Sequence, residues 1–323
     1  MQVPHCQPGE WPKDIPSSRL AAHVQLAFPT GCRVALLGLP DDLGVRLNNG
    51  RAGAKEGPTA FRHALAKYGV AHPSPTHYPR VFDAGDVVPA TGNTESSLHE
   101  THRRVSEASA ALVHAGLFPI AIGGGHDLTY AFVRGVWQAW HDQVNTTPQP
   151  WAGVYLDAHL DVRDTPGSGM PFRKLIDDGI SDRLLIAGFD PFANAQEHVA
   201  WFESHAGTII PDVARYGLPQ QSIKTLTSTH GTFCSFDMDV LDQSIAPGVS
   251  AMNPCGLSVE KAATALALIS RIPSLRCLDF MELSPPHDDQ GRTARVAAHL
   301  FLTVLMVLSQ GLFQEHDATR GAS

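Results

Sequence analysis

The chain has 323 residues, of which 43% are hydrophobic, so it is long enough to bury a large core in one domain or two smaller ones. Its formal net charge of −8 leaves no basic surface of the kind that binds nucleic acid or an anionic membrane. No run approaches ~18 consecutive apolar residues and the N-terminus has no apolar signal segment, so neither a transmembrane helix nor a secreted protein is predicted. An odd number of cysteines without C-x-x-C spacing favours reduced thiols and a cytoplasmic protein, with a regulatory disulfide through Cys32 or Cys234 left open.

Short, β-prone apolar segments alternate with longer amphipathic segments along the chain. The predicted strands are Val34–Gly38, Val81–Ala84, Ile120–Gly123, Gly153–Asp157, Leu184–Gly188, Thr208–Pro211, Phe233–Asp237 and Cys277–Met281. The predicted helices are Pro58–Tyr68, Thr94–Ala115, Leu128–His141, Asn194–Ser204, Ser258–Ile269 and Thr293–Ser309. This alternation predicts a doubly wound, mainly parallel sheet of about eight strands, covered by helices on both faces. We expect a single domain over residues 1–323, with residues 1–30 and 311–323 at its periphery.

Acidic residues and histidines gather directly after three of the predicted strands, in Gly123–Asp127, Asp157–Asp161 and Ser235–Asp242. The carboxyl ends of parallel strands meet at one edge of a sheet, where open α/β proteins place their chemistry. An isolated D-x-H or D-x-D is usually a helix cap or a solvated turn. Three such patches at consecutive strand ends are a strong signal for a metal site.

These patches offer more ligands than one catalytic ion needs. The candidate ligands are His126, Asp157, His159, Asp161, Asp237 and Asp239. Two ions ~3.5–4 Å apart require bridging carboxylates, and Asp157 and Asp237, the first Asp of each pair, are the natural bridges. His126 and Asp161 would complete one ion, and His159 and Asp239 the other. Oxygen-rich ligation with imidazole and without thiolate favours Mn²⁺ over a structural Zn²⁺.

Two other sequence features invite a functional reading that their spacing does not support. Gly123–Gly125 matches neither the dinucleotide nor the Walker phosphate motif, so we expect these glycines to let the backbone pass close to the metals. His99 and His102 lack the spacing of a zinc-protease helix and are predicted to lie on an exposed helix face.

Together, the three patches resemble the signatures of the ureohydrolase superfamily, which comprises arginases, agmatinases and formimidoylglutamases. Similar segments extend over most of the chain, at Gly53–Pro58, Asp83–Asp86, Met281–Pro285 and Thr293–Ala298. The resemblance implies an arginase-like three-layer α/β/α fold and two manganese ions held at the same positions reached above from spacing. It also implies a homo-oligomer, either a trimer or a hexamer.

Within the superfamily, the chain is most similar to formimidoylglutamases. Arg163, which follows the second patch, is one similarity, and the similar segments are Ser168–Arg173, Ala246–Ala251 and Asp289–Arg295. Asp127 differs from the subfamily pattern, which often has Glu at this position. The resemblance implies hydrolysis of N-formimidoyl-L-glutamate to L-glutamate and formamide, a step of histidine degradation, by a hydroxide that bridges the two metals.

The resemblance also assigns roles to residues outside the metal patches. Glu282 matches the residue that pairs with the amidinium nitrogens of the substrate, and Asp161 is the expected proton carrier. The two carboxylates of the substrate need cationic partners, and Arg163 is the first candidate. Arg51 and Arg173 either bind substrate as well or brace loops through backbone carbonyls.

Two alternatives remain open at this stage. A guanidino-group hydrolase acting on arginine, agmatine or a guanidino acid and releasing urea would share the metals and Glu282. Ser168 and Arg163 argue against agmatine, because its far end is cationic. A catalytically silent subunit that keeps only the fold is disfavoured, because the candidate ligands are all present.

Overall fold

A nine-stranded sheet forms the centre of the computed structural model, which describes residues 1–69, 71, 78–211 and 218–320. Across the described residues the strands lie in the order β1-β3-β2-β4-β9-β8-β5-β6-β7. They are β1 (Cys6–Gln7), β2 (Val34–Leu39), β3 (Val81–Val87), β4 (Phe118–Gly123), β5 (Trp151–Leu156), β6 (Ser181–Ala187), β7 (Gly207–Ile210), β8 (Thr232–Asp237) and β9 (Leu275–Met281). Among the described strands, the edge strand β1 is the one that pairs antiparallel with its neighbour. The predicted mainly parallel sheet is therefore confirmed.

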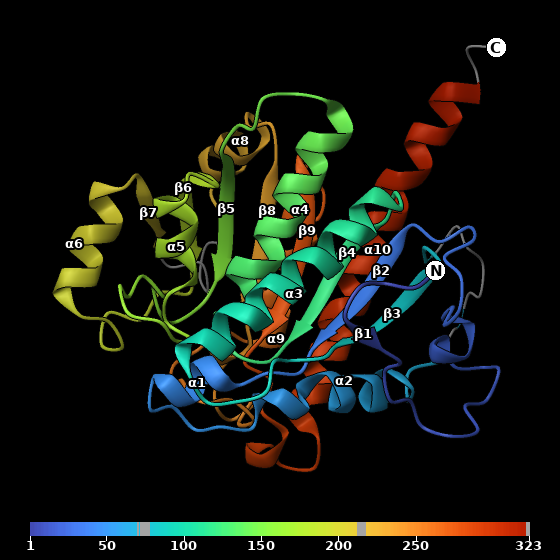
Figure 1. Cartoon of the computed structure of the whole chain (residues 1–323), viewed down its shortest axis with the longest axis horizontal. Coiled ribbons are helices and arrows are strands. Elements are labelled where there is room, and N and C mark those ends of the chain that lie inside the picture. The colour runs from blue at the N-terminus through green and yellow to red at the C-terminus, as the bar shows by residue number, and fades with distance from the viewer. Residues whose placement is uncertain (70, 72–77, 212–217, 321–323) are drawn as a thin grey trace.

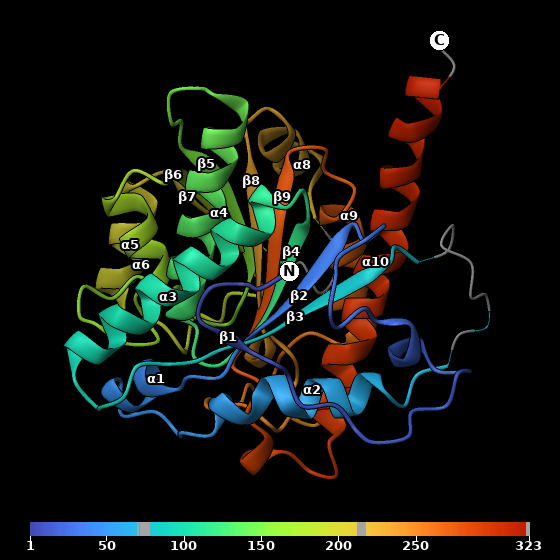
Figure 2. The same ribbon diagram turned by 45° about the vertical axis from the view of Figure 1, so that its right-hand side comes forward.

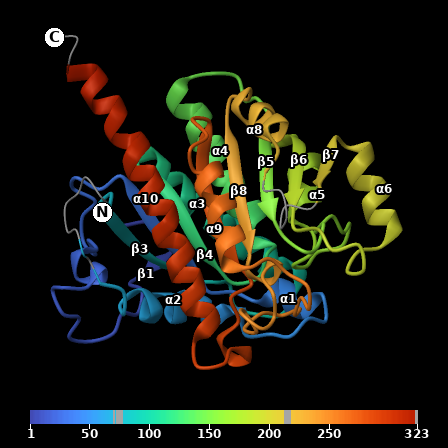
Figure 3. The ribbon, with the colours of Figure 1, turned by 180° about the vertical axis from the view of Figure 1, so that it is seen from behind.

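Helices cover both faces of the sheet and make three layers. Figure 1 shows α3 and α4 in front of the strands, and Figure 3 shows α9 and α10 on the opposite face. The α-helices are α1 (Leu43–Leu47), α2 (Gly57–Leu65), α3 (Glu95–His114), α4 (Leu128–Val144), α5 (Pro171–Asp177), α6 (Gln196–Ser204), α8 (Gln220–Thr227), α9 (Val259–Ile269) and α10 (Arg292–Arg320). The predicted α/β/α fold class is therefore confirmed.

Strand β2 explains why both faces need covering, because all of its side chains are buried. Val34 and Leu36 point into the core beneath α2, α9 and α10, whereas Ala35 and Leu37 point into the core beneath α3 and α4. Successive side chains of a strand face opposite sides of the sheet, so a continuously apolar strand must have a hydrophobic layer on each side.

The eight predicted strands all exist, and the elements that prediction missed are short. Strand β1 has two residues, and helices α1, α5 and α8 have five, seven and eight. Segments of this length contain too few turns to show a clear apolar period. The N-terminal segment adds β1 to the edge of the sheet, and the Trp11 Nε1–H donates to Asp83 Oδ2 at 2.6 Å.

The predicted end of the last helix at Ser309 is wrong, because α10 continues to Arg320. Figures 1 and 2 show its C-terminal turns projecting beyond the rest of the fold. By length and composition the segment Arg292–Gln310 could cross a membrane, but 61% of it is buried inside the structure. It packs against α2 and α9, as a core helix of a globular domain does.

Candidate metal centre

The three acidic patches meet at the carboxyl ends of four adjacent strands. His126 follows β4, the Asp157–Asp161 segment follows β5, and Asp237 ends β8. Glu282 follows β9, which lies between β4 and β8 in the sheet. Sequence positions more than a hundred residues apart therefore converge at the same edge, where α/β proteins bind ligands.

One group of side chains surrounds the ring nitrogen Nδ1 of His126. This atom lies 3.2 Å from Asp157 Oδ2, 3.0 Å from Asp161 Oδ2 and 2.9 Å from Asp237 Oδ2. The ligand atoms of these four residues all lie within 4.8 Å of one another. An ion at their centre would receive one nitrogen and three carboxylate oxygens.

A second group shares one residue with the first. His159 Nδ1 lies 3.5 Å from Asp157 Oδ1 and 3.1 Å from Asp239 Oδ2. Asp157 therefore turns one oxygen to each group, as a bridging carboxylate must. Asp237, the other predicted bridge, belongs to the first group, and its Oδ1 accepts a hydrogen bond from the Asp239 N–H at 2.8 Å.

The electrostatics of the cluster favour cations. Burial, and then the neighbouring carboxylates, raise the pKa of Asp157 and of Asp237 above its usual range. Asp239 raises the pKa of His159, and the carboxylates around His126 outweigh its burial and raise its pKa as well. Crowded, desolvated carboxylates are unfavourable unless positive charge lies among them.

Several polar atoms at the cluster are buried without a hydrogen-bond partner among the described residues. They are Asp239 Oδ1 and Glu282 Oε2, together with His126 Nδ1 and Asp157 Oδ2, whose ion-pair contact at 3.2 Å lacks hydrogen-bond geometry. Buried polar atoms are normally paired, so a group of buried polar atoms without hydrogen bonds at one place fits a site that binds a ligand. The donor set of carboxylates and imidazoles, without thiolate, fits two divalent ions such as Mn²⁺.

Backbone strain marks two residues of this edge. Asp161 has φ 48° and Glu282 has φ 63°, in the left-handed region that side chains with a Cβ rarely adopt. The Glu282 N–H donates to Gly124 O at 2.9 Å and the Asp161 carbonyl accepts from the Phe172 N–H at 3.2 Å, which holds both conformations. Such strain is concentrated at functional sites.

The glycines before His126 let the backbone approach two neighbouring segments closely. A Cβ on Gly124 would lie 1.9 Å from the carbonyl oxygen of Asp41, and a Cβ on Gly123 would lie 1.9 Å from Met281 Sδ. The close approach that they allow is thus to the loop after β2 and to β9. These contacts fix the start of the patch that carries His126.

Glu282 combines one satisfied and one unsatisfied oxygen. Its Oε1 accepts the backbone N–H of His126 at 2.9 Å, whereas its Oε2 has no partner among the described residues. Burial raises the pKa of Glu282 to about 8. A cationic group placed beside Oε2 would therefore gain a buried carboxylate partner.

The three candidate arginines have different surroundings. Arg163 is exposed, and its Nη1 donates to Asn48 Oδ1 at 3.1 Å. The Arg51 side chain donates to the carbonyl oxygens of Ser250, at 2.8 Å, and Val249, at 2.7 Å. Arg51 therefore braces the loop after β8.

Arg173 is directed toward α6. Its guanidinium lies 4.9 Å from the ring centre of Trp201, and its Nε lies 3.7 Å from Asp177 Oδ2. Arg163 thus has one side-chain hydrogen bond among the described residues, to the Asn48 side chain, whereas the two of Arg51 go to backbone carbonyls.

A cavity of about 260 Å³ lies beside the second metal group. His159 contributes to its wall, together with the loop after β6 and the loop after β8. The lining residues are Ala158, His159, Asp190, Phe192, Ala193, Ala251, Met252, Asn253 and Pro254. Phe192 is 97% exposed, which leaves this side of the cavity open to solvent.

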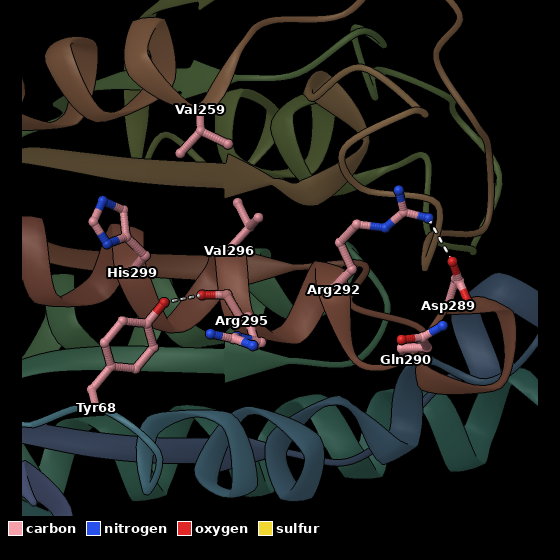
Figure 4. A pocket seen from close by; sticks show the side chains of 8 residues that line it. All are labelled: Tyr68, Val259, Asp289, Gln290, Arg292, Arg295, Val296 and His299. Atoms are coloured by element: carbon pink, nitrogen blue, oxygen red, sulfur yellow. Dashed lines mark hydrogen bonds and ion pairs between the residues drawn. The ribbon is translucent and has the colours of Figure 1, made fainter.

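The Asp289–Arg295 segment, similar to formimidoylglutamases, lines a separate cavity of about 550 Å³ along α10 (Figure 4). Arg292 donates to Ser244 O at 2.8 Å and to Asp289 Oδ2 at 2.8 Å, and the Tyr68 hydroxyl donates to Arg295 O at 2.9 Å. Arg292 ties the loop after β8 to the start of α10, and Tyr68 ties the turn after α2 to the same helix. Their role at the metal edge is therefore indirect.

The prediction that His102 lies on an exposed face is wrong. His102 is 3% exposed, and its Nε2 lies 2.7 Å from Asp127 Oδ2. Its position was recognisable, because it lies four residues after Leu98 and three before Val105, both buried. Asn48, beside Arg163, was also missed; it lies in a loop, where no periodicity marks a residue.

An open α/β fold with two acidic metal groups at its strand ends is typical of hydrolases that use two metal ions. A family model described as "Arginase family" matches residues 32–307, and the chain belongs to that family. A formimidoylglutamase of Rhodococcus jostii is 32% identical over 289 residues, covering 85% of each chain. One of Streptococcus pyogenes serotype M3 is 30% identical over 299 residues, covering 87% of this chain and 86% of its own.

A solved structure of a relative is also similar to this chain in its fold. A Trypanosoma cruzi formiminoglutamase, solved with Mn²⁺, superposes with a TM-score of 0.79 and 28% identity. The superposition covers 92% of this chain and 99% of that one. A relative of similar size thus has this fold and was solved with Mn²⁺.

Proposed function

We propose that this protein is a formimidoylglutamase, a hydrolase that cleaves N-formimidoyl-L-glutamate to L-glutamate and formamide with two Mn²⁺. One observation carries the proposal. Two acidic metal groups, which have Asp157 in common, lie at the same sheet edge as Glu282, whose buried Oε2 has no hydrogen-bond partner among the described residues. Relatives that bear this name, at about one-third identity over most of the chain, support the choice of substrate.

The residues proposed to hold the ions are those of the two groups, His126, Asp157, His159, Asp161, Asp237 and Asp239. When bound, two divalent ions supply Lewis acidity and lower the pKa of the attacking water to about 7. Four carboxylates balance the four positive charges of the ions, so the neutral cluster is compatible with its burial.

Glu282 is proposed to bind and orient the formimidoyl group. Its free Oε2 is a buried acceptor, and an amidinium presents N–H donors that match a carboxylate. Holding the amidinium there fixes the carbon that is attacked and supplies part of the rate enhancement through orientation. The bond between Oε1 and the His126 N–H keeps this carboxylate in place.

Asp161 is proposed to carry the proton from the attacking water to the departing glutamate nitrogen. Its side chain is 16% exposed, unlike the fully buried Asp157, so it lies at the accessible side of the cluster. Its strained backbone directs the carboxylate toward His126 Nδ1. A carboxylate that reaches both water and the leaving group can act as base and then as acid.

Arg163 is proposed to bind a carboxylate of the glutamate moiety. Asn48 holds it from one side through Oδ1, and the Asn48 amide in turn donates to Ser168 Oγ at 3.1 Å. A Cβ on Gly169 would lie 2.9 Å from Arg163 Cδ, so the stem of the side chain is confined as well. A restrained guanidinium loses less entropy when it binds a carboxylate.

Residues 1–323 are proposed to form one domain, and the protein to be a cytoplasmic homo-oligomer, a trimer or a hexamer. The five cysteines are free, which fits a reducing compartment. The support for an oligomer is the family resemblance. Light scattering of the purified protein measures the assembly directly, and a monomer at micromolar concentration would contradict it.

The test of the activity is product analysis after reconstitution with Mn²⁺. We expect glutamate and formamide in equal amounts from N-formimidoyl-L-glutamate, and no urea from arginine, agmatine or guanidino acids. The Glu282→Gln variant, which keeps the volume but removes the charge, serves as the matched inactive control. Urea from a guanidino compound, without glutamate from the formimidoyl substrate, would replace the proposal by a guanidino-group hydrolase.

A further inference from the structure

Two buried polar residues lie beneath His126 and are used by no step described above. Ser235 on β8 and Asp279 on β9 are register partners in adjacent strands, and both are fully buried. Neither belongs to the metal groups. A buried carboxylate is costly to desolvate, so its presence in a strand core requires a stabilising contact.

The three side chains form a directed chain of hydrogen bonds. The Ser235 hydroxyl donates to Asp279 Oδ1 at 2.5 Å, and His126 Nε2 lies 2.9 Å from Ser235 Oγ. A serine hydroxyl has one proton, which is given to Asp279, so its oxygen can only accept from the ring. When its ring is neutral, as metal binding requires, His126 therefore carries its proton on Nε2.

The consequence for the other ring nitrogen is direct. With the proton on Nε2, His126 Nδ1 presents a lone pair toward Asp157, Asp161 and Asp237, as a metal ligand must. The ring is also fixed by Phe172, whose ring packs edge-on at 5.2 Å. The hydrogen bonds set the tautomer, and the packing sets the plane.

We propose that Asp279 is a positioning residue that acts through Ser235 to hold His126 in the orientation and tautomer that bind the first metal ion. This inference rests on the proposed function, since it concerns the same metal centre. Partners of this kind tune metal affinity by roughly 10–100-fold.

The two metal groups should respond differently when the Asp279 contact is lost. His126 belongs only to the group with Asp161 and Asp237, whereas His159 belongs to the group with Asp239. Loss of the Asp279 contact should therefore weaken one of the two ions and leave the other nearly unchanged.

The test compares Asp279→Asn and Ser235→Ala with the wild-type protein. An asparagine at 279 keeps the volume, but its amide can donate to Ser235 and reverse the direction of the hydrogen bonds. Cys277→Ala is the matched control, because Cys277 is fully buried on the same face of β9 and is in neither metal group. Mn²⁺ titration by calorimetry gives the two affinities, and electron paramagnetic resonance reports whether the ions form a coupled pair.

We expect Asp279→Asn and Ser235→Ala each to weaken one of two ions by roughly 10–100-fold and to reduce the coupled-pair signal. Cys277→Ala should bind two ions as the wild-type protein does. Melting temperatures without metal separate a folding defect from the loss of an ion.

Two unaltered affinities in both variants would overturn the inference and leave the proposed function intact. The inference would also be overturned if both Mn²⁺ affinities fell equally and the metal-free melting temperature fell as far as in Cys277→Ala. The role of Asp279 would then be structural. A wild-type protein that binds no Mn²⁺ would overturn the proposed function and this inference together.

Discussion

Two clusters of buried charge in this molecule are built in opposite ways. At the β3 edge of the sheet, Arg62 donates to Asp83 Oδ2 at 2.8 Å and to Asp86 Oδ1 at 2.7 Å. At the ends of β4, β5 and β8, the ion pairs of Asp157, Asp161, Asp237 and Asp239 within the described residues are with histidines alone. The first cluster contains a permanently charged arginine, whereas the second contains only histidines, which a metal ion can bind in their neutral form.

The difference indicates which cluster is structural and which binds a ligand. Arg62 spreads its donors over Asp83, Asp86 and the Gly85 carbonyl, and Trp11 supplies a further donor to Asp83. The strand-end cluster instead leaves buried atoms unpaired. A buried acidic group with a complete set of partners stabilises the fold, while one without them is arranged for a cation from solution.

The largest expected effect follows from removing the shared carboxylate, in Asp157→Asn. Because Asp157 contributes to both metal groups, both ions should bind more weakly and turnover should fall by about 10³-fold or more, the loss expected if several kcal/mol of metal assistance disappear. Steady-state glutamate release and Mn²⁺ content measure this effect. The metal-free variant should melt above the metal-free wild-type protein, because a repelling buried charge is gone. Full Mn²⁺ content in the variant would contradict the bridging role.

Removing the fixed cation of the other cluster should affect stability and not metal binding. Arg62→Met leaves Asp83 and Asp86 buried without their partner, which we expect to cost about 3–5 kcal/mol of unfolding free energy. Urea unfolding with and without Mn²⁺ measures the unfolding free energy of the variant in its metal-bound and metal-free forms. The folded fraction should still bind two ions. Restoration of stability by Mn²⁺ alone would show that the two clusters are not separate.

The metal-free protein should become less stable as the pH rises. Folding raises the pKa of Glu282 from 4.5 to about 8, so the folded protein binds more protons than the unfolded chain between these values. The raised pKa of His159 acts in the same direction. Melting temperatures between pH 5 and pH 8 should therefore fall without metal, and the stabilisation by Mn²⁺ should be greater at pH 8. A metal-free melting temperature that rises over this range would contradict the account.

The smallest expected effect concerns Arg163, the cation proposed to bind a carboxylate of the glutamate moiety. Arg163→Ala removes a charged contact to substrate, which should raise KM by roughly 10–100-fold with a smaller change in kcat. Asn48→Ala, which only frees the guanidinium, should raise KM by less. Arg173→Ala is the matched control, because this arginine packs on Trp201. An unchanged KM in Arg163→Ala would remove that residue from the binding site.

The parts of the structure that could be predicted from the sequence are those with local patterns. The strands were recognisable from short apolar runs, and the candidate ligands from Asp and His at alternate positions directly after those runs. Their convergence followed from the geometry of a parallel sheet. The structure brings the six candidates together in two groups that share Asp157.

The remaining features depend on contacts between distant segments. His126 follows β4, and Ser235 and Asp279 lie on β8 and β9, at separations of 109 and 44 positions, so nothing near Asp279 in sequence marks its partner. The same applies to Asn48 and Arg163, which are 115 positions apart. Whether an arginine braces a loop or remains available to substrate depends on where a carbonyl group lies, as with Arg51 and Val249.

The most direct test of the central claim is the rate of glutamate release from N-formimidoyl-L-glutamate as Mn²⁺ is added to the metal-free protein. Activity should rise until two ions are bound per chain, and one formamide should accompany each glutamate. Two bound ions without turnover of this substrate, or full activity without added metal, would contradict it.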